Sequence, residues 1–266
     1  MTSTSSHAPG TFCWVELAAH DPGAAKRFYT GMFGWTADES KFGPGDDDVY
    51  TTYRLDGRDA AAQSTMDQQR RGMGIPSHWL SYVSVASADE SAGRVGGLGG
   101  TVLMEPFDVM DLGRMAIVQD PTGAVLALWQ SGKHTGVGVR DEPNSLCWNE
   151  LATTDAERAG AFYSGLFGWG TQAMEGGGGM PYTMFTSGEA MAGGMFQVTP
   201  DMQMPSVWLP YFAVEDADAG AERARSLGAS LIVPPTDIPK IGRFSLLQDP
   251  QGAMVYIIKL EYPETS

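Results

Sequence analysis

The chain has 266 residues, of which 42% are hydrophobic and 18% charged, so it is long enough for two ordinary globular domains. Acidic residues (32) outnumber basic ones (17), and the net charge of −15 disfavours nucleic acid or an anionic membrane surface as a partner. With two cysteines, no apolar N-terminal segment and no run of about 18 apolar residues, the sequence predicts a reduced, cytoplasmic protein.

The first predicted elements are a strand and a helix. Residues 14–19 alternate between apolar and other side chains, as in a half-buried strand. Asp21 then suits a helix N-cap, with Pro22 at the first helical position and Gly34 as the C-terminal cap. Short strands are expected next, at about 49–55 and 59–66.

The same plan follows a second time. A strand is predicted at about 79–85, and a short helix at about 88–98 that ends at Gly99. The sequence QDPTG (119–123) provides the Pro and Gly of a hairpin connection. Strands are expected at about 101–105, 114–119 and 124–130. This half of the chain therefore has the pattern βαβββ twice.

The second half of the chain repeats the first. TFCWVELAAHDPGAAKRFYTGMFGW (11–35) parallels SLCWNELATTDAERAGAFYSGLFGW (145–169), and 98–125 parallels 227–254. Matched Cys, Trp, Phe and Tyr residues exclude low complexity as the cause. The predicted organisation is a disordered tail (1–10), a first domain (11–131), a linker (132–144), a second domain (145–260) and a tail (261–266).

Four motifs in both copies carry a family resemblance: the D-x-x-x-A-x-x-F-Y helix, the F-G-W at its end, the W-L-x-Y strand and the Q-D-P-x-G-A turn. With them the chain resembles the VOC superfamily (glyoxalase, bleomycin resistance protein and dioxygenase), in the tandem actinobacterial type related to a mycobacterial culture-filtrate antigen family. The resemblance implies an α+β fold. Four βαβββ modules would form two glyoxalase-like domains with curved mixed sheets that enclose cavities. Whether modules pair within or between copies stays open.

The resemblance also implies where a metal would be bound. Enzymes of this family hold a divalent metal on His, Gln or Glu at three positions, on two strands and after the D-P-x-G turn. The matching residues here are Trp14, Leu80 and Ala127 in the first copy, and Trp148, Leu209 and Tyr256 in the second. None of these is a metal ligand, and the second copy has no histidine. The sequence therefore predicts no metal and no cofactor.

Two glutamates are the candidate catalytic residues. Glu16 shares a strand face with Trp14, and Glu150 shares one with Trp148. A carboxyl group in a partly apolar cavity would have a raised pKa, which suits a general acid or base. As an alternative, both glutamates accept structural hydrogen bonds; a new metal held by glutamate and water is a third possibility.

Aromatic side chains are the candidate ligand-binding residues. Tyr82 and Tyr211 are expected on the cavity face, with Trp129 and Tyr256 as their partners on the last strands and Trp14 and Trp148 on the first. Such walls suit a planar aromatic molecule. The alternative is that these rings fill the sheet with no ligand.

Two further pairs of residues are interpreted as structural. Trp35 and Trp169, which follow the helix caps, are expected to pack on the sheet. Cys13 and Cys147 lie on the opposite strand face from the tryptophans and are expected to be core thiols.

The leading hypothesis is a metal-independent protein that binds a small hydrophobic or aromatic molecule, with sequestration of a toxic compound as one role. The alternative is an enzyme that uses the two glutamates: a glyoxalase-like lyase, or a hydroxylase or other tailoring enzyme of aromatic secondary metabolism. A third hypothesis is an interaction protein with vestigial cavities. The expected state is a monomer or a homodimer.

Overall fold

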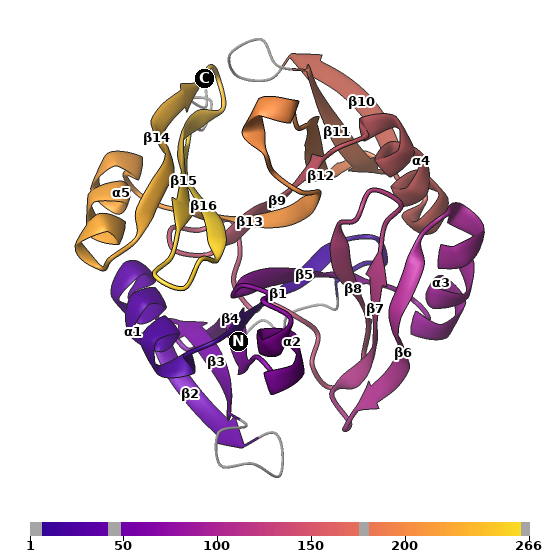
Figure 1. Cartoon of the computed structure of the whole chain (residues 1–266), viewed down its shortest axis with the longest axis horizontal. Helices are drawn as coiled ribbons and strands as arrows, with labels where there is room; N and C mark the ends of the chain where they lie inside the picture. Colours follow the sequence, from indigo (N-terminus) through magenta and orange to yellow (C-terminus); the bar gives the residue numbers. More distant parts are fainter. Residues whose placement is uncertain (1–6, 42–48, 176–180, 262–266) are drawn as a thin grey trace. The chain divides into compact units, whose positions relative to one another are not determined.

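The computed structural model describes residues 7–41, 49–175 and 181–261. The first copy consists of two βαβββ modules, each a strand, a helix and three further strands (Figure 1). The first module contains β1 (Phe12–Ala19), α1 (Pro22–Phe33), β2 (Thr36–Lys41), β3 (Val49–Leu55) and β4 (Arg58–Thr65), and is followed by α2 (Gln68–Gly72). The second contains β5 (His78–Ser84), α3 (Ala88–Val95), the 3-10 turn η1 (Gly96–Leu98), β6 (Thr101–Val109), β7 (Gly113–Gln119) and β8 (Val125–Ser131).

The second copy repeats this order. Its first module contains β9 (Leu146–Thr153), α4 (Ala156–Phe167), β10 (Gly170–Glu175), β11 (Pro181–Ser187) and β12 (Ala190–Gln197). After the 3-10 turn η3 (Pro200–Met202) come β13 (Val207–Ala213), α5 (Ala217–Ser226), β14 (Ser230–Ile238), β15 (Gly242–Gln248) and β16 (Met254–Leu260).

Each copy contributes one mixed sheet of eight strands. The orders are β2-β3-β4-β1-β5-β8-β7-β6 and β10-β11-β12-β9-β13-β16-β15-β14. Within a module the first strand pairs with the last in parallel, as in β1 with β4 and β5 with β8, and the remaining pairs are antiparallel. The α+β fold and the four βαβββ modules are therefore as predicted.

The helix caps are the residues that the sequence indicated. The Asp21 side chain accepts a hydrogen bond from the Ala24 N–H (2.9 Å), and Asp155 caps α4 in the same way. Gly34 ends α1 in the left-handed region at φ 69°, where a residue with a Cβ would be strained. These signals are local, and for this reason they could be read from the sequence.

Other boundaries differ from the expectations. The polar edge strand β2 (Thr36–Lys41) and the short helix α2 were not predicted individually, because neither has an apolar periodicity. β6 continues to Val109 instead of ending near residue 105, through two register irregularities that bend it along β7. The predicted helix 88–98 is α3 followed by η1.

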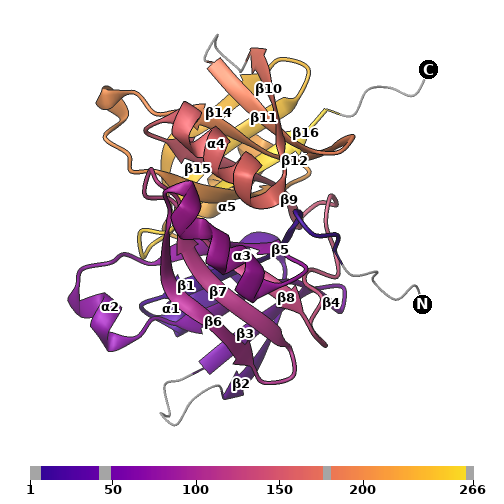
Figure 2. The same ribbon diagram turned by 90° about the vertical axis from the view of Figure 1, so that its right-hand side faces the viewer.

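The chain divides into two compact units, and each unit combines modules from both copies. Unit 1 consists of Met1–Trp14, Leu80–Gly136 and Asn149–Leu209; unit 2 consists of Val15–Trp79, Val137–Trp148 and Pro210–Ser266. In unit 1, helices α3 and α4 lie side by side, and in unit 2 α1 lies beside α5 (Figures 1 and 2). The question of module pairing is thus answered for these compact units: their cores are completed between copies.

A buried hydrogen-bond chain joins the copies in unit 2. Trp79 Nε1 donates to Tyr29 Oη (3.0 Å), which donates to Asp249 Oδ2 (2.9 Å). The other carboxylate oxygen of Asp249 accepts backbone N–H groups of Gln251 (2.8 Å) and Ala253 (2.9 Å), so the Q-D-P-x-G turn is held from within. Burial raises the pKa of Asp249, and burial together with this carboxylate holds the pKa of Tyr29 well above its usual value.

Unit 1 contains the same chain of donors and acceptors. Trp208 Nε1 donates to Tyr163 Oη (2.7 Å), and Tyr163 Oη donates to Asp120 Oδ2 (2.9 Å). The F-Y helix motif of one copy therefore binds the D-P-x-G turn of the other in both units. This contact gives the two most recognisable motifs of the sequence a common structural purpose.

The F-G-W tryptophans are buried, as expected, and each has a second contact. Trp169 Nε1 donates to the Gly10 carbonyl (2.8 Å) in unit 1, and Trp35 Nε1 donates to the Asn144 carbonyl (2.8 Å) in unit 2. Each indole thus fixes the segment before the first strand of the other copy. Cys13 and Cys147 are buried, also as expected, and burial raises the pKa of Cys147 to about 12.

Among the described residues, no helix is long and apolar enough to cross a membrane.

Candidate functional site

A buried aromatic cluster lies in unit 1, at the inner strands of the first copy. The Tyr82 ring meets Trp129 edge-on with centroids 6.3 Å apart, and Trp129 lies near the His134 ring (5.8 Å). His134 in turn meets Trp14 edge-on at 4.5 Å. The structure thus brings together three of the predicted ligand-binding residues and adds His134, which the sequence placed in the linker. Trp14, Tyr82 and Trp129 are all buried, so a ligand here has to displace a neighbouring group.

The cluster continues as an apolar face along β6, β7 and β8. Strand pairing places Met115 opposite Trp129, and Phe107 opposite Met115. One register step away, Ile117 is opposite Met104. Exposure rises along this face, from the buried Trp129 to 37% for Phe107 and 45% for Met104. We call Met104, Phe107, Met115, Ile117 and Trp129 the β6–β8 face. It is an apolar surface that leads from solvent to the aromatic cluster, and methionine makes such surfaces adaptable.

The matching face of the second copy, in unit 2, is different. The Tyr211 and Tyr256 rings stack face to face, with centroids 4.0 Å apart and planes 12° apart. Phe244 packs against Tyr256 at 5.9 Å. At the outer edge, Thr236 occupies the position that corresponds to Phe107. The second copy therefore fills this face with its own rings, and its edge is more polar.

The Glu16 carboxylate is held in a polar group in unit 2. Its Oε1 accepts a hydrogen bond from Ser64 Oγ (2.7 Å), and its Oε2 accepts one from Tyr50 Oη (3.2 Å). Tyr50 and Ser64 are register partners on β3 and β4, so the sheet itself sets this geometry. Neither hydroxyl group was predicted from the sequence. Alternation along a strand indicates which face of the sheet Tyr50 and Ser64 are on, but it does not indicate that they reach Glu16.

The Glu150 carboxylate, in unit 1, has one counterpart of this arrangement. Its Oε2 accepts a hydrogen bond from Tyr182 Oη (2.9 Å), and Phe196 stands where the first copy has Ser64. Tyr182 reaches the carboxylate by lying over Gly194, since a Cβ at that position would overlap the phenol ring. Glu150 is 7% exposed, and Trp148, its neighbour on the same strand face, is half-buried. Both glutamates are therefore hydrogen-bonded, as the structural alternative requires, and both have a phenol group close enough to exchange a proton.

The residues at the family's metal positions do not fit a divalent metal. Ala127 is the register partner of Tyr82, Tyr256 is engaged in the ring stack with Tyr211, and Trp14 is an indole. Throughout the described residues, no three His, Cys, Asp or Glu side chains gather as a metal ion would require.

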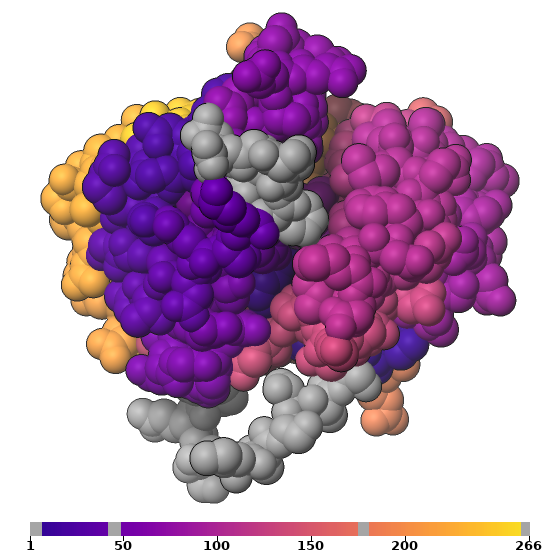
Figure 3. Space-filling model, turned by 90° about the horizontal axis from the view of Figure 1, so that it is seen from below, coloured from indigo at the N-terminus to yellow at the C-terminus, as the bar shows by residue number. Residues whose placement is uncertain are grey.

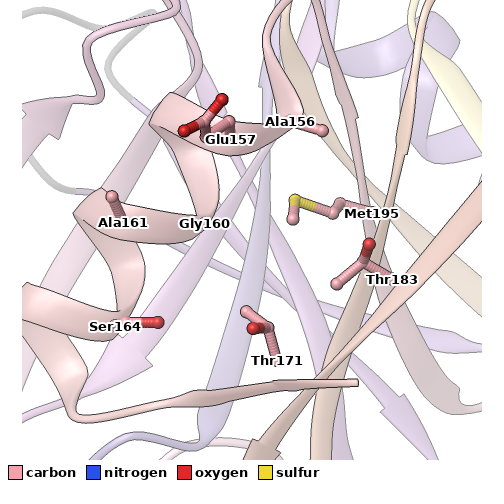
Figure 4. Close-up of a pocket in the computed structure, with 8 residues that line it drawn as sticks. All are labelled: Ala156, Glu157, Gly160, Ala161, Ser164, Thr171, Thr183 and Met195. Carbon is pink, nitrogen blue, oxygen red and sulfur yellow. The ribbon is translucent and has the colours of Figure 1, made fainter. Parts of the chain in front are cut away.

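A separate pocket of about 400 Å³ lies in unit 1, between α4 and strands β10 to β12 (Figure 4). Gly160 and Ala161 on the helix and Thr171 and Thr183 on the strands line it, and the Met195 side chain points into it (Figure 4). It was not predicted, and the predicted site residues do not line it. The first copy fills the corresponding place in unit 2 with Lys26 and Gln63, where Gln63 Nε2 donates to the Pro22 carbonyl (2.8 Å).

The helix α2 was also not predicted, and it stands clear of the strands of unit 2 (Figures 2 and 3). Arg71 Nε donates to the Met66 carbonyl (2.6 Å), which ties the helix to the end of β4. Met73, the C-cap residue that follows the helix, is 69% exposed.

Comparison with known proteins agrees with this architecture. The sequence model of the Glyoxalase/Bleomycin resistance protein/Dioxygenase superfamily matches residues 11–128 and again residues 129–257. "Putative glyoxylase CFP32" of Mycobacterium bovis is 40% identical over 259 residues, which cover 97% of this chain and 98% of that protein. "Anthracycline biosynthesis protein DauV" of Streptomyces sp. strain C5 is 36% identical over 269 residues and 96% of each chain.

Among solved structures, the 2,3-dioxygenase LapB of Pseudomonas sp. KL28 superimposes with a TM-score of 0.65 at 11% identity, covering 98% of this chain and 97% of LapB. At that identity the likeness shows the fold alone. The two segments that match the family model, and the relatives at 40% and 36% identity, establish the family. The chain belongs to the Glyoxalase/Bleomycin resistance protein/Dioxygenase superfamily.

Proposed function

We propose that this protein binds a small planar aromatic or hydrophobic molecule on the inner strands of the first copy, without a metal. The observation that carries the proposal is the β6–β8 face, where Phe107 and Met104 are open to solvent and lead to buried aromatic rings. An apolar molecule that covers this face would remove both side chains from water, which favours binding. A relative named for anthracycline biosynthesis supports an aromatic ligand.

The second copy provides a built-in control for this proposal. Replacing Phe107 with threonine and Met104 with valine gives the first copy the residues found at the matching positions of the second. Loss of a covered Phe side chain corresponds to roughly 1.5–3 kcal/mol, so we expect at least a tenfold loss of affinity. Met73→Val, at the exposed helix α2, is the matched control and should leave affinity unchanged.

The experiment is a thermal-shift screen of planar aromatic compounds, anthraquinones included, followed by calorimetric titration of the best compound into wild type and these variants. Sequestration as a role requires that the bound compound is recovered unchanged. If no compound binds, or if the Phe107 and Met104 variants bind as tightly as wild type, the proposal is wrong.

A second candidate function is an enzyme, and the hydrogen-bonded Glu–Tyr pairs favour it. Glu16 with Tyr50, and Glu150 with Tyr182, could move a proton to or from a bound substrate in a lyase, hydroxylase or other tailoring reaction. The relatives named for glyoxylase and anthracycline biosynthesis support such chemistry.

The two functions are separated by substitutions at the glutamates. Replacing both glutamates with glutamine should abolish turnover and spare affinity if the protein is an enzyme. Under the binding proposal, product analysis of wild type with any bound compound should show no conversion.

A further inference from the structure

We propose that the indole N–H of Trp14 anchors the ligand through a hydrogen bond, and that the ligand is therefore an aromatic molecule with an acceptor oxygen, such as a ketone or quinone. The inference rests on the proposed function and deepens it by naming the chemical class of the ligand and the copy that holds it.

The Trp14 side chain is 3% exposed, so its polar atom, the indole Nε1, is removed from water. Within the described residues, its Nε1 makes no hydrogen bond. An unsatisfied buried donor costs roughly 1–3 kcal/mol, and native proteins rarely keep one without a use. By contrast, the indole N–H groups of Trp35, Trp79, Trp129, Trp169 and Trp208 all have acceptors.

The group packed against this donor is the His134 ring. It meets Trp14 edge-on, with planes 85° apart and centroids 4.5 Å apart. His134 is half-buried, so part of this residue reaches solvent, while its ring Nε2 is shielded from it. Rotation of this one side chain would uncover the indole, whereas movement of Trp129 would also break its own Nε1 hydrogen bond to the His134 carbonyl (3.0 Å).

Backbone contacts hold His134 in place over Trp14. The His134 N–H donates to the Leu112 carbonyl (3.0 Å), on the turn between β6 and β7. Two residues later, Gly136 has φ 116° and lies so close to the Cys13 carbonyl that a Cβ would overlap it. The linker backbone is therefore held at His134 by the β6–β7 turn and at Gly136 by β1.

The surroundings of the Trp14 donor determine the chemical class of the ligand. An N–H donor beside the His134 ring, in a cluster that continues from His134 to Trp129 and Tyr82, selects a flat molecule with an acceptor at its edge. A ketone or quinone oxygen has lone pairs and no hydrogen, so it satisfies the donor directly. A hydrocarbon of the same shape would leave the donor unsatisfied. Access to it runs along the β6–β8 face, which ends at Trp129.

The test compares fluorenone with fluorene, two molecules of nearly the same shape of which only the ketone carries an acceptor. Calorimetric titration of wild type should give tighter binding of fluorenone, with one molecule per chain. Trp14→Phe keeps the ring and removes the donor, so fluorenone affinity should fall roughly fivefold to tenfold and fluorene affinity should not fall. The matched control is Met73→Val, beside the exposed helix α2, and it should leave both affinities unchanged.

A second measurement does not depend on the folding of a variant. In ¹H–¹⁵N spectra of wild type, the Trp14 indole signal should move downfield on addition of fluorenone and should not do so with fluorene. His134→Ala should increase fluorenone affinity, because the imidazole ring no longer has to be displaced.

These experiments distinguish failure of the Trp14 anchor from failure of the proposed binding function. If wild type binds both molecules equally, or if Trp14→Phe retains full fluorenone affinity, the anchor is refuted and the binding function stands. If the Trp14 indole proton exchanges with bulk water and its signal does not move when fluorenone is added, water is the partner of the donor. This result also refutes the anchor. If wild type binds neither molecule nor any compound of the aromatic screen, the proposed function fails and the inference fails with it.

Discussion

Replacement of Tyr29 by phenylalanine removes one oxygen atom from the buried chain between Trp79 and Asp249. Two hydrogen bonds are lost: the one that Tyr29 donates to the carboxylate (2.9 Å) and the one that it accepts from the indole (3.0 Å). A hydrogen bond to a charged group is worth about 1.5–3 kcal/mol, and a buried donor left without an acceptor costs about 1–3 kcal/mol. Phenylalanine recovers part of this loss, because it has no hydroxyl group to desolvate. We expect the free energy of unfolding to fall by about 3 kcal/mol.

The assay is urea unfolding followed by tryptophan fluorescence, with the melting temperature as a second readout. For a chain of this size, a loss of about 3 kcal/mol corresponds to roughly 6–12 °C in Tm. Tyr163→Phe is the matched variant, because the same chain of Trp208, Tyr163 and Asp120 lies in unit 1. The reasoning is refuted if both variants lose less than about 1 kcal/mol.

Three further predictions follow from single residues. Gly242→Ala should destabilise the protein by roughly 2–3 kcal/mol in urea unfolding, because φ is 150° and a Cβ would overlap the Lys259 carbonyl; an unchanged midpoint would contradict this. Gly194→Ala should displace Tyr182 from Glu150 and destabilise the protein by roughly 1–3 kcal/mol in urea unfolding, with no change expected if that contact is absent in solution. Burial raises the pKa of Asp249, so the folded state holds this proton more tightly than the unfolded state does. The stability of wild type relative to Asp249→Asn should therefore increase as the pH falls from about 7 to about 4.5, and a constant difference would refute the shift.

Much of the fold could be predicted because its signals are local or repeated. Asp21 and Gly34 cap α1 by contacts within a few residues, and the second copy repeats them at Asp155 and Gly168. The edge strand β2 (TADESK) is exposed along nearly its whole length, so it has no apolar pattern to identify it. Its place in the sheet follows from pairing with β3, which is a tertiary contact.

The pairing of modules could not be read from the sequence, because it depends on which of two similar surfaces is nearby. Tyr29 and Tyr163 are equivalent by sequence, as are Asp120 and Asp249. Nothing in a single motif states that Tyr29 binds the aspartate of the other copy. The distinction lies in chain connectivity and packing.

The candidate site was predicted in part. Alternation along strands placed Tyr82 and Tyr211 on one face, with Trp129 and Tyr256 as their expected partners, and the structure brings the rings of each pair together. His134 was missed because a Gly-rich segment carries no signal for the side chain that it presents. The exposed edge at Phe107 was missed because the predicted strand ended at about residue 105 and β6 continues beyond it. The roles of the two glutamates stay predictions.

The central claim is that an aromatic ligand binds this fold without a metal. The most direct measurement is the ligand-induced shift in Tm of EDTA-treated protein, compared with the same protein reloaded with Mn(II), across planar aromatic compounds. The account predicts that at least one compound raises Tm by the same amount in both samples. No shift with any compound, or a shift seen in the metal-loaded protein alone, would contradict it.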